Sequence, residues 1–318
     1  MINTRDKEYD VLVMVVPKDF LRLRDNYERY EEYLPGRNIY FVGSEEVGKL
    51  VSESGLGARV GWIDENSILP FDEVHRVMEE RMSEWLLGRP LPRNITGWYY
   101  QQFLKMEYAR VCKDGYYLVW DGDTIPCRHF SMFDESGVPY LDLKHEYHEE
   151  YFNTLTKLVP DLHKCIEKSF IAEHMLIDAG LMRELLGDIE KADFKGNAFW
   201  EKIIWSIDMA KIQSNSFSEF ESFGTYIVLR HPEAYRLRNW HSFRYGGEFF
   251  HSDRITLEDY EWLGRDFYAI SFEKAHTVRA DHENLFDNPE YQSKLSARQM
   301  LEIAQEEFEG DSYKEVWD

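Results

Sequence analysis

The stretch Tyr116–Pro126, YYLVWDGDTIP, decides the fold class of this 318-residue chain. Its first half is a short apolar run, which is typical of a buried β-strand. Buried parallel strands of α/β sheets carry their binding groups at the carboxyl end. That end here holds two carboxylates, Asp121 and Asp123, on either side of Gly122. Because side chains of an extended chain repeat every second residue, we expect both acids to point the same way.

This acid pair predicts a metal site at the edge of the sheet. Two carboxylates this close repel each other unless a cation lies between them, and hard divalent cations prefer oxygen ligands. Gly122 lets a ligand approach the backbone because it has no side chain. The simplest interpretation is a divalent cation that receives a phosphate group. A bare Asp-x-Asp also occurs in ordinary turns after strands, so the apolar strand and the helical segment upstream carry this interpretation.

The segments before this stretch predict an α/β fold. Short apolar runs indicate strands, and longer runs with helical periodicity indicate helices. Strands are expected over residues 9–16, 38–42 and 58–63, and helices over 20–34, after the N-cap Ser44, over 71–87 and over 97–111. This alternation implies a parallel sheet with right-handed crossovers.

The segments after it predict a mainly helical region. Further strands are expected over residues 139–143, 235–245 and 267–271, and helices from about Asp161 through Leu185, over 200–209 and over 217–229. The composition shows no linker, so we expect one domain over residues 1–290. Its two halves would be residues 1–143 and 144–290, followed by a charged helix and a mobile tail over 291–318.

The composition excludes some classes of partner and compartment. The net charge of −22, from 37 basic and 59 acidic residues, argues against binding to nucleic acid or to anionic lipid as a main function. The three cysteines have no metal-type spacing, which fits a reducing compartment. The N-terminus lacks the apolar core of a signal peptide, and no segment reaches the roughly 20 apolar residues of a membrane helix. We therefore expect a cytoplasmic protein whose only membrane contact is peripheral, at the inner face.

These features together resemble one enzyme family. An α/β first half, an aromatic helix over residues 97–106 (GWYYQQFLKM) and an apolar strand that ends in Asp-Gly-Asp are similar to the GT-A glycosyltransferases. They look like a bacterial branch linked to surface polysaccharide synthesis, which residues 170–175 (FIAEHM) and 218–226 (SEFESFGTY) fit as well. The resemblance covers residues 9 to 276. It implies a GT-A-like nucleotide-binding sheet flanked by helices, with residues 1–143 as the donor-binding half and a mainly helical acceptor half.

The resemblance also implies a donor, an acceptor and a metal. A nucleoside diphosphate sugar, expected to be a UDP-sugar, would lie across the carboxyl edge of the sheet, and a glycan or lipid-linked hydroxyl would accept the sugar. Mn²⁺ or Mg²⁺ would join the diphosphate to Asp123 directly, while Asp121 would hold the ribose or a metal-bound water. A late histidine is the expected further ligand. His276 is preferred over His241 and His251, and a structural role for each remains the alternative.

Two places could contact the donor. Lys18 and Asp19 follow the first strand, where loops usually contact the nucleotide, although Asp19 could equally cap the next helix. Gln101 and Lys105 share a helical face because they are four residues apart. Lys105 could neutralise the phosphates, which an acidic protein needs to do locally. The alternative for both is a solvated polar helix face.

Glu173 and His174 are candidates for acceptor binding because they interrupt an apolar run. Burying such groups unpaired is costly, so either acceptor hydroxyls or a mutual hydrogen bond should satisfy them. Glu219 and Glu221 alternate with phenylalanines, which would raise a carboxylate pKa by desolvation. In an inverting transferase, as the resemblance implies, Glu221 or, as second choice, Glu219 would deprotonate the acceptor hydroxyl. Ordinary surface acids are the alternative, and a retaining reaction would need no such base.

Some further residues have less specific expectations. Arg236, Arg238 and Arg244 could contact phosphate or acceptor, or could pair with surface acids. Residues 64–66, DEN, follow a strand and could line the same rim, or could equally form a solvated turn.

Three rival functions remain open. A nucleotidyltransferase would usually have a glycine-rich phosphate loop after the first strand, where this chain has Pro17-Lys18-Asp19. A DxD phosphatase would have its nucleophilic aspartate near the N-terminus, whereas this motif lies in the middle of the chain. It would also have a threonine two residues after the second acid, where this chain has Ile125. A non-catalytic carbohydrate-binding protein would suit the aromatic content but would not need the acid pair.

Overall fold

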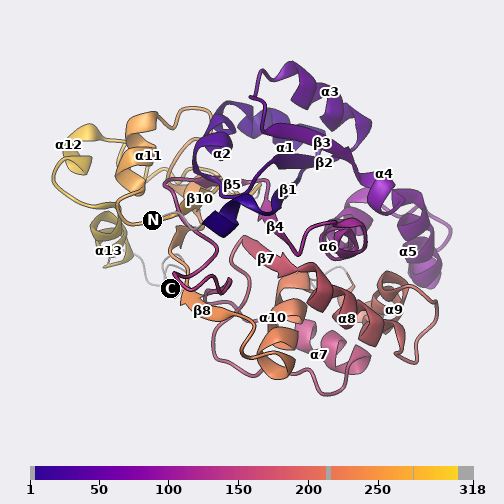
Figure 1. Ribbon diagram of the computed structural model, residues 1–318. Helices are drawn as coiled ribbons and strands as arrows, with labels where there is room; N and C mark the ends of the chain where they lie inside the picture. Colours follow the sequence, from indigo (N-terminus) through magenta and orange to yellow (C-terminus); the bar gives the residue numbers. More distant parts are fainter. Residues whose placement is uncertain (1–3, 213–215, 275, 307–318) are drawn as a thin grey trace.

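The central element of the fold is a five-stranded sheet in the order β3-β2-β1-β4-β7. The computed structural model describes residues 4–212, 216–274 and 276–306. Strands β1 (Asp10–Met14), β2 (Ile39–Gly43), β3 (Val60–Asp64) and β4 (Tyr116–Asp121) are parallel, and β7 (His174–Asp178) joins β4 antiparallel. The predicted α/β class, with a mainly parallel sheet flanked by helices, is confirmed (Figure 1).

The helices of the first half lie close to their predicted positions. They are α1 (Pro17–Leu23), η2 (Arg24–Asn26), α2 (Glu28–Tyr33), α3 (Glu45–Glu53), α4 (Glu65–Ile68), α5 (Phe71–Leu86) and α6 (Arg93–Val111). The helix predicted over 20–34 instead begins at Pro17, which suits a first helical turn, and divides into α1, η2 and α2. Tertiary contacts explain the division, because the Tyr27 and Tyr30 hydroxyls donate hydrogen bonds to the Gly122 and Thr124 carbonyls.

The second half contains one clear error of prediction. Residues 174–178 form the edge strand β7, within a segment predicted to be mainly helical. A short apolar run such as MLI does not distinguish a buried helix from a buried strand, and pairing with β4 decides the outcome here. The remaining helical elements are α7 (Glu149–Leu158), α8 (Ala179–Glu190), α9 (Phe199–Ser206), η3 (Met209–Lys211), α10 (Glu219–Arg230), η4 (Gly246–Glu248), α11 (Leu257–Leu263), α12 (Pro289–Gln292) and α13 (Ala297–Glu306). The predicted mobile tail beyond Glu306 lies outside the described residues.

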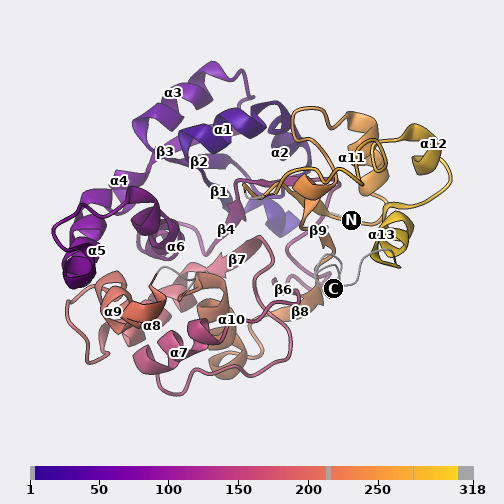
Figure 2. The ribbon, with the colours of Figure 1, turned by 180° about the vertical axis from the view of Figure 1, so that it is seen from behind.

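Alternate residues of the sheet face two separate cores. Along β1, Leu12 and Met14 belong to a core that also contains residues of α5 to α10, whereas Val11 and Val13 belong to a core with α1 to α3, α11 and α13. Figures 1 and 2 show these two groups of helices on opposite sides of the sheet. The sheet is therefore buried on both faces, which explains why its strands read as continuous apolar runs.

Two small sheets attach the rest of the chain next to the end of β4. Strand β5 (Thr124–Pro126) pairs antiparallel with β10 (Ala269–Ser271), which pairs with β9 (Ser242–Phe243). Strand β6 (Tyr140–Leu143) pairs with β8 (Arg236–Asn239). The strands predicted over 139–143 and 267–271 are confirmed, and the one over 235–245 is divided into β8 and β9. These pairings bring the segments around residues 244 and 273 beside the Asp-Gly-Asp turn.

No helix in the described parts of the chain is both long enough and apolar enough to span a membrane.

Candidate active site

The carboxyl ends of β1 and β4 open onto a cleft of about 990 Å³. Both halves of the chain line it, from Met14 at the end of β1 to Lys274 after β10. Nine of its lining residues are acidic and four are basic. An acid-rich cleft attracts cations, and an anionic ligand would need a cation to enter it.

Asp121 ends β4, Asp123 lies in the turn that follows it, and both line this cleft. The turn between them is fixed at Gly122, because a Cβ there would lie 2.7 Å from the Met14 carbonyl oxygen. Tyr27 holds the same turn by donating a hydrogen bond of 2.9 Å to the Gly122 carbonyl oxygen. The backbone therefore sets the position of both carboxylates before any ligand binds.

Asp123 carries an unbalanced charge. Burial, together with repulsion from Asp121 and Glu273, raises the pKa of Asp123 to about 7. Within the described residues it forms no ion pair, and its hydrogen bond from Thr124 is long, at 3.5 Å. Such a carboxylate is suited to a cation that the protein itself does not provide.

Asp121, in contrast, already has a cationic partner. The Lys105 ammonium lies 2.7 Å from Asp121 and 2.6 Å from Glu219, and its side chain is only 3% exposed. Burial opposes its charge, but the two carboxylates outweigh burial and raise the pKa of Lys105. Lys105 thus lines the cleft, and its ammonium group is already paired with Asp121 and with Glu219 of α10.

The other donor candidates are divided between cleft and surface. Gln101 and Asp19 line the cleft, whereas Lys18 is exposed and does not. Asp19 forms an ion pair of 3.3 Å with Lys274, and its Oδ1 atom is buried without a hydrogen-bond partner. Lys274 therefore faces the cleft from a segment far along the chain.

Glu173 and His174 have separate environments. The Glu173 carboxylate lines the cleft and accepts hydrogen bonds of 3.0 and 3.1 Å from the Ser242 hydroxyl. Its backbone has a φ of 61°, a strained value for a residue with a side chain. His174 points into the protein instead, between the Ala172 carbonyl oxygen and the Asp142 carboxylate. Glu173 is available to a ligand, and His174 is not.

The two candidate bases on α10 also differ. Glu219 lines the cleft, while Glu221 is 2% exposed and does not line it. Glu221 accepts a hydrogen bond of 2.6 Å from Ser169 and lies 3.8 Å from Lys164. Burial raises the pKa of Glu221, although Ser169 and Lys164 oppose the rise. Residues two positions apart on a helix do not share a face, so only one of the pair reaches the cleft.

None of the three late histidines, all of them described, lines the cleft. His276 lies 3.9 Å from Glu248, and His251 lies 3.0 Å from Glu283. Across the described residues, no group of three or more histidine, cysteine or carboxylate side chains is arranged to hold a metal ion by itself. The structure therefore does not bring His276 together with Asp121 and Asp123.

The cleft lining includes residues that the sequence did not single out, Glu146, Glu273 and Lys274, whereas Arg244 was expected to contact phosphate or acceptor or to pair with acids. Arg244 forms ion pairs with Glu146 and, at 3.1 Å, with Glu273, and all three line the cleft. Glu273 and Lys274 follow β10, so their position after a late strand is the signal that could have identified them. Glu65 also lines the cleft, in agreement with the rim expected at residues 64–66. Arg236 and Arg238 instead pair with Asp134 and Asp142.

Comparison with known proteins gives a family. Residues 45–296 match the model of a family of unknown function (DUF6492), and the chain belongs to this family. No curated protein matches the chain in sequence.

Several solved structures are similar in shape to this chain. Mouse xyloside xylosyltransferase 1 is 14% identical over 85% of this chain and 99% of its own, with a TM-score of 0.44. The galactosyltransferase LgtC, in complex with donor and acceptor sugar analogues, is 10% identical over 96% of this chain and 99% of its own, with a TM-score of 0.42. The mannosyltransferase Ktr4p from S. cerevisiae, in complex with GDP, is 11% identical over 65% of this chain and 68% of its own, with a TM-score of 0.36.

Proposed function

We propose that this chain is a metal-dependent glycosyltransferase that moves a sugar from a nucleoside diphosphate sugar to a hydroxyl of a glycan or lipid-linked acceptor. The observation that carries the proposal is the Asp121-Gly122-Asp123 turn at the carboxyl end of β4, inside an acid-rich cleft, with the charge of Asp123 unbalanced. A role in surface polysaccharide synthesis, with a UDP-sugar as donor, is the specific form that the resemblance supports.

The carboxylates fit a hard divalent cation. Asp123 and the second oxygen of Asp121 would hold Mn²⁺ or Mg²⁺, because these ions bind through one or two carboxylates plus substrate phosphates. A sparse protein ligand set is therefore expected even without a histidine. When bound, the ion would neutralise the acids and stabilise the negative charge of the departing diphosphate.

Lys274 is the cation that we assign to the diphosphate. Its side chain is 57% exposed at the cleft, and its ion pair with Asp19 is 3.3 Å long. A flexible lysine can exchange such a weak pair for a phosphate oxygen. Asp19 would keep its ion pair of 3.7 Å with Arg22. Lys105 has a different role, because its ion pairs of 2.7 Å with Asp121 and 2.6 Å with Glu219 hold Asp121 in a fixed position.

Glu173 is the carboxylate that we assign to the acceptor hydroxyl. In an inverting reaction the base must reach the hydroxyl that attacks the sugar. Glu219 lines the cleft but is bound to Lys105, and Glu221 lies outside the cleft lining. Glu173 lines the cleft and its only hydrogen-bonding side chain among the described residues is the neutral Ser242 hydroxyl. It can therefore hold the acceptor hydroxyl and receive its proton.

Thermal unfolding with nucleotides and metal tests the proposal. A ligand that binds only the folded state raises the melting temperature by mass action. UDP or GDP at 100 times its dissociation constant, with Mn²⁺, should raise it by about 5 °C. The nucleotide without metal should raise it far less, and Asp123→Asn should remove the metal-dependent part.

Some outcomes would replace the proposal with a rival. Hydrolysis of p-nitrophenyl phosphate that Asp123→Asn abolishes would indicate a phosphatase. Release of pyrophosphate from a nucleoside triphosphate and a sugar phosphate would indicate a nucleotidyltransferase. No metal-dependent stabilisation by any nucleoside diphosphate or nucleotide sugar would remove the basis of the transferase assignment.

A further inference from the structure

We propose that a second hollow, beside the cleft, binds a neutral sugar unit of an extended carbohydrate acceptor. The hollow has a volume of about 540 Å³ and lies between α7 and η3, and none of its lining residues lines the cleft. This volume is within the range of small-molecule sites. The inference rests on the proposed glycosyl transfer and extends it from the reacting sugar to the unit that precedes it.

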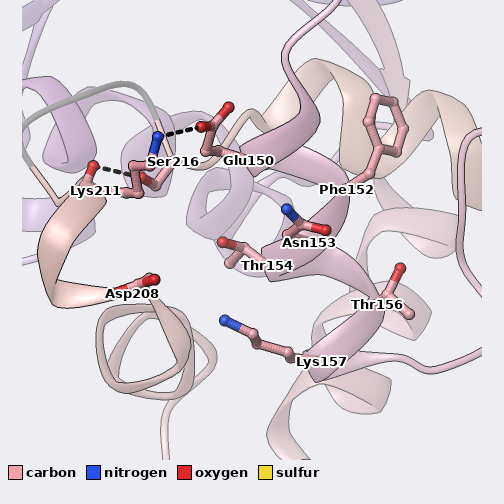
Figure 3. Close-up of a pocket in the computed structure, with 9 residues that line it drawn as sticks. All are labelled: Glu150, Phe152, Asn153, Thr154, Thr156, Lys157, Asp208, Lys211 and Ser216. Carbon is pink, nitrogen blue, oxygen red and sulfur yellow. Dashed lines mark hydrogen bonds and ion pairs between the residues drawn. The ribbon is translucent and has the colours of Figure 1, made fainter.

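Polar side chains converge on this hollow from facing elements. Figure 3 shows Thr154 and Lys157 on α7 pointing toward the same space as Asp208, which precedes η3. Thr154 lines this hollow although the residue as a whole is only 2% exposed. A hydroxyl on such a wall can donate a hydrogen bond to a ligand hydroxyl and accept one from it.

The charges of the hollow indicate a neutral ligand. Lys157 and Lys211 are balanced by Glu150 and Asp208, and Glu150 lies 2.9 Å from Lys211. A balanced set does not favour a phosphate or a cation, in contrast to the acid-rich cleft. Carboxylates accept hydrogen bonds, ammonium groups donate them, and the Asn153 amide does both. A ring with several hydroxyl groups can use all of these partners at once.

The hollow and the cleft lie on two sides of the same two chain segments. On α7, Glu150 lines the hollow and Tyr151 lines the cleft; before α10, Ser216 lines the hollow and Phe217 lines the cleft. These two segments therefore form the wall between the two sites, and α7 with its side chains is about 10–12 Å across. An acceptor of two or three sugars that leaves the cleft over this wall would place an inner unit in the hollow. Residues 213–215 lie outside the described chain, and the site includes none of them.

Saturation-transfer NMR on the full chain tests the inference without any need for turnover. The probes are the neutral disaccharides maltose, cellobiose and lactose, each compared with its methyl monosaccharide. At least one disaccharide should bind more tightly than its monosaccharide. Thr154→Val should weaken that binding by about three- to tenfold, as expected for one hydrogen bond. Lys157→Met should weaken it by about tenfold, because a charged donor is lost.

A matched control and a second ligand separate the possible outcomes. Lys191→Met removes an exposed lysine at the end of α8, with a side chain 77% exposed, and should leave disaccharide binding unchanged. UDP with Mn²⁺, measured in the same samples, reports the cleft. Nucleotide binding without any disaccharide preference would overturn the inference and leave the proposed function intact. Disaccharide binding that neither Thr154→Val nor Lys157→Met weakens would also overturn the inference. If the wild-type chain does not bind UDP with Mn²⁺ at all, the proposed function itself is contradicted.

Discussion

Two groups of charged side chains lie on either side of the Trp120–Asp121 end of β4, and they differ in how their charges are balanced. On the interior side, Arg238 donates hydrogen bonds of 2.6 and 2.7 Å to Asp142, and His174 Nε2 lies 2.9 Å from the same carboxylate. The ring of His174 packs between Trp120 and Trp240. On the cleft side, Asp123 faces other acids and no described residue forms an ion pair with it.

The same residue type therefore has opposite properties in the two groups. Burial opposes the charge of Asp142, but Arg238 and His174 outweigh it and lower its pKa to about 2. Burial, with Asp121 and Glu273, raises the pKa of Asp123 to about 7. A charged side chain that is paired with an opposite charge from the same protein has a structural role. A charged side chain in a cleft without such a partner is a candidate for a functional role.

The largest effect is expected from breaking the balanced group. Asp142→Asn leaves Arg238 and His174 without their carboxylate in the interior, which should lower the free energy of unfolding by about 3–5 kcal/mol. Denaturant unfolding followed by tryptophan fluorescence measures the loss. The folded fraction of Asp142→Asn should still bind UDP with Mn²⁺. A loss below about 1 kcal/mol would show that the group contributes little to stability.

The corresponding change in the cleft should affect activity and spare stability. Asp123→Asn removes a carboxylate from the expected cation site, so metal-dependent transfer or donor hydrolysis should fall by more than about 100-fold, or roughly 3 kcal/mol. The melting temperature without ligand should stay the same or rise, because repulsion from Asp121 and Glu273 is relieved. Turnover is measured with the donor that gives the largest thermal shift. Turnover within a factor of three of the wild type would exclude Asp123 from the reaction.

Acid titration sharpens the comparison further. The pKa of Asp142 is lower in the folded chain than in the unfolded chain, so its contribution to stability is fully present above the unfolded value of about 4. That contribution should be lost as the pH falls through about 2, and its size is roughly 2 kcal/mol. Denaturant unfolding between pH 5 and pH 2 should therefore show a steeper loss for the wild type than for Asp142→Asn. Parallel curves for the two proteins would contradict the assigned shift.

The sequence was informative where one local pattern determines the outcome. The apolar runs located β1, β2, β3 and β4, and with β4 the place of Asp121 at the edge of the sheet, whereas Asp123 lies in the turn that follows β4. The edge strand β7 was missed because its five residues are too few to distinguish a strand from a helix, and only β4 across the sheet decides between them. Local pattern and long-range pairing supply different information.

The residues of the cleft were harder to predict for the same reason. Lys105 was expected to face a phosphate, but it meets Glu219, which lies 114 positions further along the chain. Arg244 and Glu273 reach the cleft through the pairing of β9 with β10, which no local pattern indicates. His276 was favoured because it follows a strand, yet the chain turns it toward Glu248. Function at this site depends on contacts between distant segments.

The smallest effect is expected at Glu221, which is buried yet separate from both groups. Its Oε2 atom lacks a hydrogen-bond partner, and its pKa is raised by burial, so replacing the carboxylate with an amide removes an unfavourable charge. Glu221→Gln should change the transfer rate by less than about twofold and should leave stability the same or slightly higher.

Glu173→Gln, the same substitution at the cleft wall, should instead lower kcat by about 100-fold, as expected for a general base, while donor binding changes little. Steady-state kinetics and nucleotide titration of both variants decide the assignment. A large loss of kcat in Glu221→Gln with a normal Glu173→Gln would transfer the role of base to Glu221 and would require α10 to turn toward the cleft when substrate binds.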